Sequence, residues 1–248
     1  MTADEQAMFA QHVEKLLQEH RNERIFRFEF NHQLYWIKQP EVLHGIWKIL
    51  KPHPKQAFQN ELNLLKELNA KHAPVPTLML SGDNFFVLKD VGLTINQWVE
   101  NADLGLEIEE QNQILSDAVH GLTELHRRNL IHGRPALRDI AWEKGQIIFM
   151  DFEAQSHSQN LEWKKMRDIL IFIHGVCRTK SLSNEQIQYV INTCSVCCEP
   201  QLWQQVLNFV EKNRCLYYVL LPFKPIARMD LIAIYRLFEN MFPLIKKH

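Results

Sequence analysis

Hydrophobic and polar positions near the N-terminus repeat at helical spacing. Four apolar side chains recur three or four residues apart: Phe9, Val13, Leu16 and Leu17. This period predicts an amphipathic helix over residues 3–20. Thr2 and Glu5 stand three residues apart at its start, which is the pattern of a capping box, so the helix is expected to begin directly after Thr2.

Four short extended segments predict two β-hairpins before residue 90. They are residues 25–30, in which apolar and charged positions alternate, and residues 34–38, 76–81 and 84–89. Gly82 and Asp83 separate the last two segments and are a strong hairpin signal. Between the two pairs, residues 56–71 carry apolar side chains at helical spacing and predict a helix. A further short helical piece is expected around residues 44–50.

Beyond residue 90 the pattern becomes mainly helical. Apolar side chains repeat at helical spacing in five segments: residues 109–128, 161–177, 183–198, 201–213 and 228–246. Ser183 and Gln186 form a second capping box. Residues 141–149 contain Gly145 between two short extended runs and predict a small hairpin. The change near residue 90 predicts an α+β fold class with two parts, residues 1–90 and residues 91–248.

Composition and charge exclude several classes of protein. The chain is 46% hydrophobic and 23% charged, as globular proteins are, and its net charge of −1 lacks the basic excess of nucleic-acid-binding proteins. No apolar run is long enough to span a bilayer, and the longest, Ile169–Val176 and Tyr217–Phe223, are predicted to be core elements. The first residues lack the pattern of a secretory signal, so a cytoplasmic protein is expected. Its basic residues leave peripheral contact with a membrane surface open.

The cysteines are expected to be free thiols in a reducing compartment. There are five of them, at positions Cys177, Cys194, Cys197, Cys198 and Cys215. An odd number without a secretion signal argues against a disulfide framework. A structural zinc site needs four ligands, usually from two paired clusters, and the second cluster is missing here. Buried thiols without a metal are therefore the favoured interpretation.

Four polar residues follow one another in an order that suits phosphoryl transfer. Lys38 ends an apolar strand, and Glu61 lies in the helix that follows. His132 ends the loop after a long amphipathic helix, and Asp151 closes the small hairpin after that loop. A lysine on a strand neutralises phosphate oxygens, a helix glutamate holds the lysine, and an aspartate binds the magnesium that bridges the phosphates. Each residue alone is a weak signal, and the ordered set is what indicates a nucleotide site.

These residues and their neighbours resemble the motifs of the protein-kinase-like superfamily. Six segments within residues 25–175 carry the resemblance: Tyr35–Lys38, Phe58–Leu62, Phe86–Val91, Leu122–Gly133, Ile147–Glu153 and Arg167–Leu170. The His-Gly loop and the compact C-terminal part are most similar to bacterial lipopolysaccharide-core sugar kinases and related small kinases. The resemblance implies a bilobal fold, with a small antiparallel-sheet N-lobe in residues 1–90 and a mainly helical C-lobe in residues 91–248.

The resemblance also implies a role for each matching residue. Lys38 would hold the phosphates of ATP, and Glu61 would pair with Lys38. The adenine would be held by backbone groups of three residues: Leu88, Lys89 and Asp90. Asp139 and Asp151 would bind Mg²⁺, and Asp168 would brace the catalytic loop from the start of a later helix.

Two departures set this chain apart from the family pattern. Arg134 stands at the position of the catalytic base, and Asp139 replaces the asparagine that is the second metal ligand. A guanidinium stays protonated and cannot accept a proton, but it can clamp a phosphate or an anionic acceptor. Asp139 is the alternative base if the loop folds differently. In addition, residues 22–37 contain no glycine, whereas a kinase covers the phosphates with a Gly-rich loop.

Three hypotheses stay open at this point. The first is a phosphotransferase that uses ATP and Mg²⁺ and acts on a sugar, a lipopolysaccharide core or a protein hydroxyl, with Arg134 orienting or clamping a reactant. The second is a pseudokinase, which uses the same fold as a nucleotide-dependent or nucleotide-free protein-binding module. The missing catalytic base and the missing glycines favour the pseudokinase. The phosphotransferase is favoured by four charged residues that are present together: Lys38, Glu61, Asp139 and Asp151. The third, an unrelated α+β scaffold, predicts that Lys38 and Asp151 lie far apart.

Overall fold

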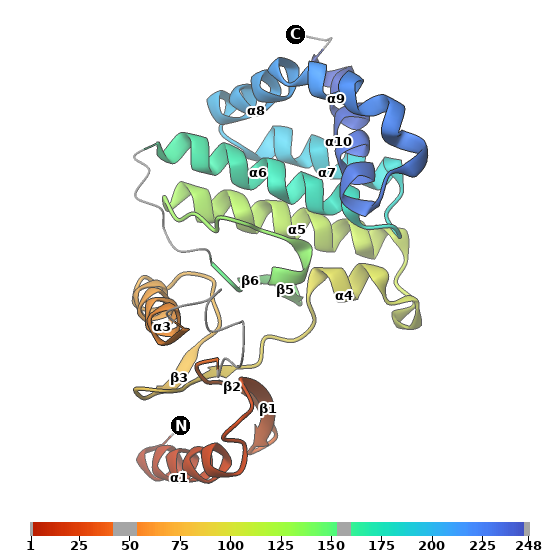
Figure 1. Cartoon of the computed structure of the whole chain (residues 1–248). Coiled ribbons are helices and arrows are strands. Elements are labelled where there is room, and N and C mark those ends of the chain that lie inside the picture. Colours follow the sequence, from red (N-terminus) through yellow and green to blue (C-terminus); the bar gives the residue numbers. More distant parts are fainter. Residues whose placement is uncertain (1, 42–53, 153–159, 246–248) are drawn as a thin grey trace. The chain divides into compact units, whose positions relative to one another are not determined.

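The structure, a computed structural model, describes residues 2–41, 54–152 and 160–245. The chain divides into two units, Met1–Val91 and Gly92–His248 (Figure 1). In its described residues the first unit carries an antiparallel sheet and two helices, and the second unit is mainly helical, so the fold class is α+β as predicted. The helical piece expected around residues 44–50 lies outside the described residues.

The sheet of the first unit consists of two hairpins placed side by side. Its strands are β1 (Ile25–Phe30), β2 (Gln33–Lys38), β3 (Leu78–Ser81) and β4 (Phe86–Lys89). Their order is β1-β2-β4-β3, and every neighbouring pair is antiparallel. Both hairpins were predicted, but β3 and β4 each begin two residues later than expected. Pro76 cannot donate to a strand ladder, and Gly82 donates its N–H to the carbonyl of Phe85 at 2.9 Å, which closes the turn.

Two helices cover the sheet on opposite faces. Helix α1 (Ala3–Glu19) buries Phe9 and Val13 against Phe28 and the alternate residues of the neighbouring strands. Its predicted capping box between Thr2 and Glu5 is present. Helix α3 (Pro54–Ala70) packs Phe58 and Leu62 on Phe86, a strand residue whose side chain points away from α1. Because side chains alternate along a strand, successive residues of β4 serve the two different cores.

The second unit is a bundle of helices with one small hairpin. Its longer helices are α5 (Ile108–Arg127), α6 (Leu161–Arg178), α7 (Asn184–Cys197), α8 (Pro200–Lys212) and α10 (Met229–Ile245). Helix α6 packs against α7, α8 and α10, and α5 packs against α7 (Figure 1). All five were predicted from helical spacing, and the capping box of Ser183 and Gln186 is present at the start of α7.

The hairpin of strands β5 (Ile140–Glu143) and β6 (Gln146–Phe149) packs against α5. The close approach occurs at Gly121 of α5, where an added Cβ would lie 2.9 Å from Ile147 Cγ2. Two short elements before α5 were not predicted: α4 (Ile95–Glu100) and the 3₁₀ helix η1 (Ala102–Leu104). A further 3₁₀ turn, η2 (Leu137–Asp139), leads directly into β5. The hairpin thereby fixes the residues that precede and follow it.

One predicted core element is on the surface. Ile169–Val176 lies in α6 and contributes Ile169, Phe172 and Ile173 to the main core, as expected. In contrast, Tyr217–Phe223 spans α9 (Arg214–Leu220) and the start of η3 (Leu221–Ile226), and the structure buries none of the described residues of these two elements. The interpretation of this run as core was therefore wrong. Within the described ranges, no helix combines the length and the apolar character that crossing a membrane requires.

Candidate functional site

The first candidate group is an ion pair between the sheet and helix α3 in the first unit. Tyr35 and Ile37 of β2 belong to the core under α1, so the alternation of the strand turns Lys38 toward the other face. There the Lys38 ammonium forms an ion pair with the Glu61 carboxylate, and Nζ lies 5.9 Å from the centre of the Phe86 ring. The Lys38 side chain is only 15% exposed. A cation is therefore held largely out of water by an acidic partner, and that partner is the glutamate which the resemblance implied.

The segment predicted to hold adenine is already engaged in hydrogen bonds. The N–H of Lys89 donates to the carbonyl of Thr77 at 3.0 Å, and the N–H of Asp90 donates to the carbonyl of Leu34 at 3.0 Å. The Asp90 carboxylate accepts a hydrogen bond of 2.6 Å from Trp36 Nε1. Leu88 lies within the ladder, opposite Trp36. An adenine bound here would have to hydrogen-bond to carbonyl oxygens of the segment or displace these hydrogen bonds.

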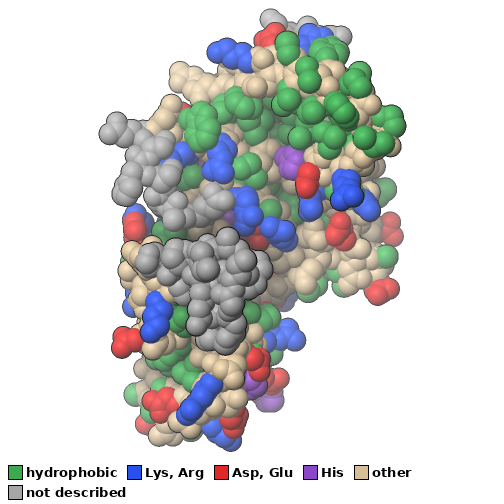
Figure 2. Space-filling view, in the orientation of Figure 1, with side chains coloured by type: hydrophobic (Ala, Val, Ile, Leu, Met, Phe, Trp, Pro, Cys, Tyr) green, Lys and Arg blue, Asp and Glu red, His purple; other side chains and the backbone are tan. Residues whose placement is uncertain are grey.

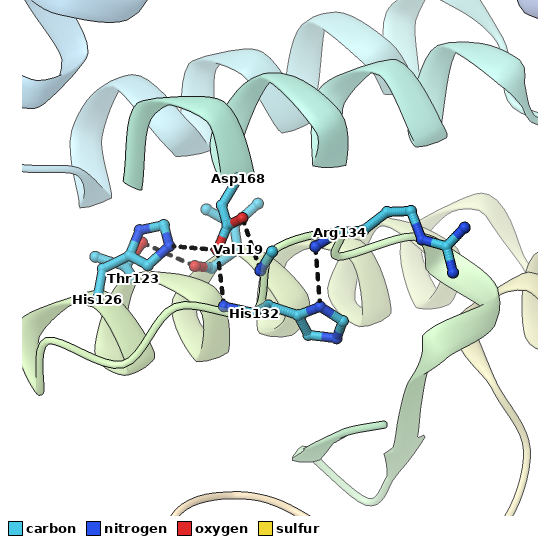
Figure 3. A network of polar contacts seen from close by, with 7 residues as sticks. Val119, Thr123, His126, His132, Arg134 and Asp168 are labelled. Carbon is cyan, nitrogen blue, oxygen red and sulfur yellow. Dashed lines mark hydrogen bonds and ion pairs between the residues drawn. The ribbon is translucent and has the colours of Figure 1, made fainter. Parts of the chain in front are cut away.

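The second candidate group is the loop between α5 and β5, which a buried carboxylate holds in place. Asp168 is fully buried and accepts hydrogen bonds from the backbone N–H groups of His132 at 2.9 Å and Gly133 at 3.0 Å (Figure 3). His126 Nε2 lies 3.3 Å from the same carboxylate. The bracing role predicted for Asp168 is thus present. Asp168 lies well inside α6 rather than at the start of that helix.

His126 is a member of this network that sequence reasoning missed. The histidine is buried on the inner face of α5 beside Leu122 and Leu125. Its position in the helical repeat marks it as inward-facing, and a buried polar side chain needs a partner. The sequence therefore contained a signal for burial, while the identity of the partner came only from the fold.

Arg134 stands apart from this buried network. Its side chain is exposed and points away from Asp168, as Figure 3 shows, while its backbone N–H donates to His132 Nδ1 at 3.3 Å. The His132 ring stacks on Phe152, with ring centres 4.7 Å apart and planes inclined by 22°. A protonated guanidinium at this place can bind an anion but cannot accept a proton.

Asp139 and Asp151 form a pair of carboxylates beside the loop. Asp139 is buried, and the N–H of Met150 donates to its carbonyl at 2.8 Å, which ties the end of β6 to η2. Burial and the neighbouring charge of Asp151 raise the pKa of Asp139, and the Arg138 and Arg134 guanidinium groups oppose that rise. Arg138 Nε lies 3.7 Å from Asp139 Oδ1. The two guanidinium groups therefore compensate the burial of Asp139 and the charge of Asp151 only in part.

Two further observations mark the carboxylate pair. Asp139 Oδ2 is buried and has no hydrogen-bond partner among the residues that the structure describes. Asp151 is exposed and has a φ of 55°, a left-handed conformation that non-glycine residues adopt infrequently. Buried oxygens without partners and residues in rare backbone conformations both gather at functional sites. Residues 153–159, which include the last residue of the predicted segment Ile147–Glu153, lie outside the described residues.

The carboxylate pair suits a hard cation such as Mg²⁺ that takes its remaining ligands from water and from a bound molecule. Mg²⁺ takes oxygen ligands and is usually held by one or two carboxylates together with water and substrate phosphates. Over the described ranges, no group of three or more His, Cys, Asp or Glu side chains is arranged to hold a metal on its own. A cation at Asp139 and Asp151 would thus depend on ligands from a bound molecule.

The cysteines take no part in either group. All five sulfurs in the described residues are free thiols, and burial raises the pKa of Cys177 to about 12 and that of Cys198 to about 11. Cys215 is exposed, so the prediction of a uniformly buried set was wrong for this residue. Cys197 is half-buried, with Sγ 3.5 Å from His120 Nδ1.

Comparison with known proteins gives one relative and no function. No family model matches the chain. A protein of Haemophilus influenzae is 48% identical over 241 residues, which cover 96% of this chain and 97% of the relative. That protein is described only as an uncharacterized protein. The relative extends over both units described above and adds no ligand or activity to them.

Proposed function

We propose that this chain, which belongs to one family with the Haemophilus influenzae protein, is an ATP-dependent phosphotransferase of protein-kinase-like fold. The observation that carries the proposal is the ion pair of Lys38 and Glu61. A strand lysine held by a helix glutamate is the arrangement that protein kinases use to bind nucleotide phosphates. The low exposure of Lys38 strengthens its attraction for an anion, because water screens the charge less.

Asp139 and Asp151 are proposed to hold Mg²⁺. Three observations support their fit to the ion: the buried Asp139 oxygen without a described partner, the raised pKa of that carboxyl group, and the second carboxylate beside it. A divalent cation would offset the cost of keeping the two negative charges close together. When bound, the ion would supply charge neutralisation for the phosphates. Its remaining ligands would come from water and from those phosphates.

Arg134 is proposed to hold a negatively charged oxygen of a reactant. Phosphoryl transfer depends mainly on positioning and charge stabilisation, and a base contributes only about 100- to 10,000-fold. An enzyme with arginine at the base position is therefore expected to be slow rather than inactive. The acceptor is proposed to be a hydroxyl of a sugar, of a lipopolysaccharide core or of a protein. An arginine at this place favours an acceptor that itself carries negative charge.

The experiment that tests the proposal is thermal unfolding with ATP and Mg²⁺, separately and together. ATP at 100 times its dissociation constant adds about 2.7 kcal/mol of stability, or roughly 5–10 °C for a chain of this size. Lys38→Met is expected to abolish the shift caused by ATP. Asp151→Asn is expected to abolish only the part that requires Mg²⁺. The two variants thereby separate phosphate binding from metal binding.

Two matched variants control for loss of charge. Lys71→Met breaks an exposed ion pair with Glu67 on the same helix that carries Glu61. Asp103→Asn removes an exposed carboxylate in the second unit. Both are expected to keep the full shift. If millimolar ATP and Mg²⁺ leave the wild-type unfolding temperature unchanged, the proposed nucleotide site does not exist.

A second candidate function is a pseudokinase that binds a protein partner. Two observations favour it: the exposed guanidinium at the base position, and a tight turn of Asn31 and His32 between β1 and β2 in place of a Gly-rich loop. Protein kinases carry the corresponding lysine on their third strand, whereas in the described residues only β1 precedes β2, the strand of Lys38. Transfer of labelled phosphate from ATP to the protein or to an added acceptor distinguishes the two functions. Nucleotide binding without any transfer would support the pseudokinase.

A further inference from the structure

Apolar side chains are exposed next to one another on α9 and η3 of the second unit. Six large apolar side chains of these two elements are exposed: Leu216, Tyr218, Val219, Leu221, Phe223 and Ile226. We call these six residues the α9–η3 patch. Val219 is 66% exposed and Ile226 is 78% exposed. Figure 2 shows apolar side chains gathered over this end of the unit, at the upper right of the view. Large continuous apolar patches of this kind mark surfaces that contact something other than water.

Contacts with α10 hold the segment that carries the patch and turn its apolar side chains outward. The Tyr217 ring points inward and packs on Phe242 of α10, with ring centres 5.1 Å apart. The Tyr235 hydroxyl donates to the carbonyl of Leu220. Lys224 Nζ lies 2.5 Å from Glu239 Oε1, so the middle of η3 is also held to α10. These contacts orient the segment, and they leave the six apolar side chains facing outward.

The segment that carries the patch contains basic residues and no acidic ones. Residues 212–229 contain no aspartate or glutamate and four basic residues: Lys212, Arg214, Lys224 and Arg228. Three carboxylates lie nearby, and two of them are paired: Glu239 with Lys224, and Asp230 with Arg178 at 2.6 Å. Glu211 is the third. With Arg178 included, five cations stand against three carboxylates here, and apolar side chains with such a basic excess beside them suit a surface that is apolar within and negatively charged outside.

We propose that the α9–η3 patch docks the protein on the surface of an anionic phospholipid bilayer. Apolar side chains would enter the boundary between head groups and acyl chains, and the flanking lysines and arginines would meet the acidic head groups. Tyr218 has an apolar ring and a polar hydroxyl, which suits the same boundary. This inference rests on the surface alone and does not require the phosphotransferase activity.

Charge argues against a second copy of the chain as the occupant. A twofold dimer brings the same patch of each copy together, so Arg214 and Arg228 of one copy would face a surface equally rich in cations. Like charges placed against each other in an interface cost several kcal/mol. An anionic lipid surface satisfies both the apolar and the basic side chains.

The test is flotation of the purified chain with lipid vesicles. One set of vesicles is pure phosphatidylcholine, and the other contains about one third phosphatidylglycerol, which provides the negative surface that basic residues recognise. We expect the chain to float with the acidic vesicles at low salt and to be released as salt screens the attraction. Val219→Asp and Ile226→Asp are each expected to weaken binding at least about tenfold, because a carboxylate would enter the apolar boundary.

A matched control and a charge variant sharpen the result. Val196 is 83% exposed on α7 and lies outside the patch, so Val196→Asp is expected to float like the wild type. Arg228→Gln is expected to weaken binding about fivefold, which is the effect of one basic residue near an acidic membrane. Because all these side chains are exposed, each variant is expected to unfold at the wild-type temperature.

Three outcomes would overturn the proposal. The first is that the wild type stays at the bottom of the gradient with acidic vesicles at low salt. The second is that Val219→Asp and Ile226→Asp float as well as Val196→Asp does. The third is a wild-type dimer in sedimentation equilibrium that Val219→Asp dissociates, since this would assign the patch to a second copy of the chain.

Discussion

Two buried aspartates in the second unit have opposite environments. Asp168 accepts hydrogen bonds from the backbone of His132 and Gly133 and lies beside His126 Nε2. Asp139 has one buried oxygen without a partner among the described residues, and Asp151 adds a second negative charge beside it. Both carboxylates border the same loop. One is compensated by the protein, whereas the other is only partly compensated, by Arg138 and Arg134.

The difference separates a residue that builds the loop from a residue that is available to a ligand. A buried carboxylate with several donors stabilises the fold, because its charge and the donors satisfy one another. A buried carboxylate with poor compensation destabilises the fold, and this cost is recovered when a cation binds. The first kind of residue should be needed for stability and the second for binding. The predictions below follow from this contrast, beginning with the largest effect.

Asp168→Ala is expected to destabilise the protein by roughly 3–5 kcal/mol, because removal of one partner leaves buried polar groups unsatisfied. The backbone N–H groups of His132 and Gly133 and the ring of His126 would all lose their acceptor. Urea-induced unfolding, followed by circular dichroism, measures the loss. Asp168→Asn keeps one acceptor oxygen and is expected to lose less.

The control for Asp168 is Asp230, which pairs with Arg178 of α6, the helix that also carries Asp168. Asp230 accepts a hydrogen bond of 2.6 Å from Arg178 Nε, but its side chain is 77% exposed. Exposed ion pairs contribute little, so Asp230→Ala is expected to change stability by less than about 1 kcal/mol. Equal losses for Asp168→Ala and Asp230→Ala would show that Asp168 does not brace the loop.

Asp139→Asn is expected to stabilise the free protein, in contrast to Asp168→Ala. The amide removes a buried negative charge next to Asp151, so the free protein should gain up to about 1 kcal/mol, or roughly 2–4 °C in unfolding temperature. The same variant should lose the stabilisation that Mg²⁺ adds in the presence of ATP. Asp103→Asn, at an exposed position, is the matched control and should do neither. A destabilised Asp139→Asn protein would mean that this carboxylate, like Asp168, supports the fold.

Local signals in the sequence were enough for most elements of the fold. The capping boxes at Thr2 and Ser183 correctly located the starts of two helices, because those interactions lie within one helical turn. Thr94 and Gln97 form the same box before α4, yet that helix has only six residues and was missed. Burial was harder to predict. The run Tyr217–Phe223 is apolar but exposed, because hydrophobic residues are common on surfaces and only distant packing decides which are covered.

The candidate site could also be predicted only in part. The pairing of Lys38 with Glu61 was implied by the resemblance to the protein-kinase-like superfamily, whose motifs occur in the same order in this chain, and the structure contains this ion pair. The compensation of Asp168 by His126 and the lack of compensation at Asp139 were not predicted. Both depend on which distant groups surround a buried carboxylate, and sequence spacing carries little information about such neighbours.

The smallest predicted effect is a difference in pH dependence between the wild type and Asp139→Asn. Because burial raises the pKa of Asp139 in the folded protein, the folded state holds this proton more tightly than the unfolded chain does. The stabilisation from the protonated group is complete below the ordinary aspartate pKa of about 4 and is lost as pH rises through the folded pKa. Asp139→Asn should therefore match the wild type near pH 4 and become the more stable protein as pH rises.

Paired unfolding temperatures of the two proteins, measured in steps from about pH 4 to pH 7, test this prediction of a widening gap. Every other titrating group is common to both proteins, so its contribution cancels in the difference to first order. At neutral pH, saturating ATP and Mg²⁺ should make the wild type the more stable of the two proteins. The cation compensates the charge of Asp139 in the wild type, whereas the asparagine of the variant binds it poorly. A gap that stays constant with pH would show that the effect of the substitution comes from packing rather than from the charge of Asp139.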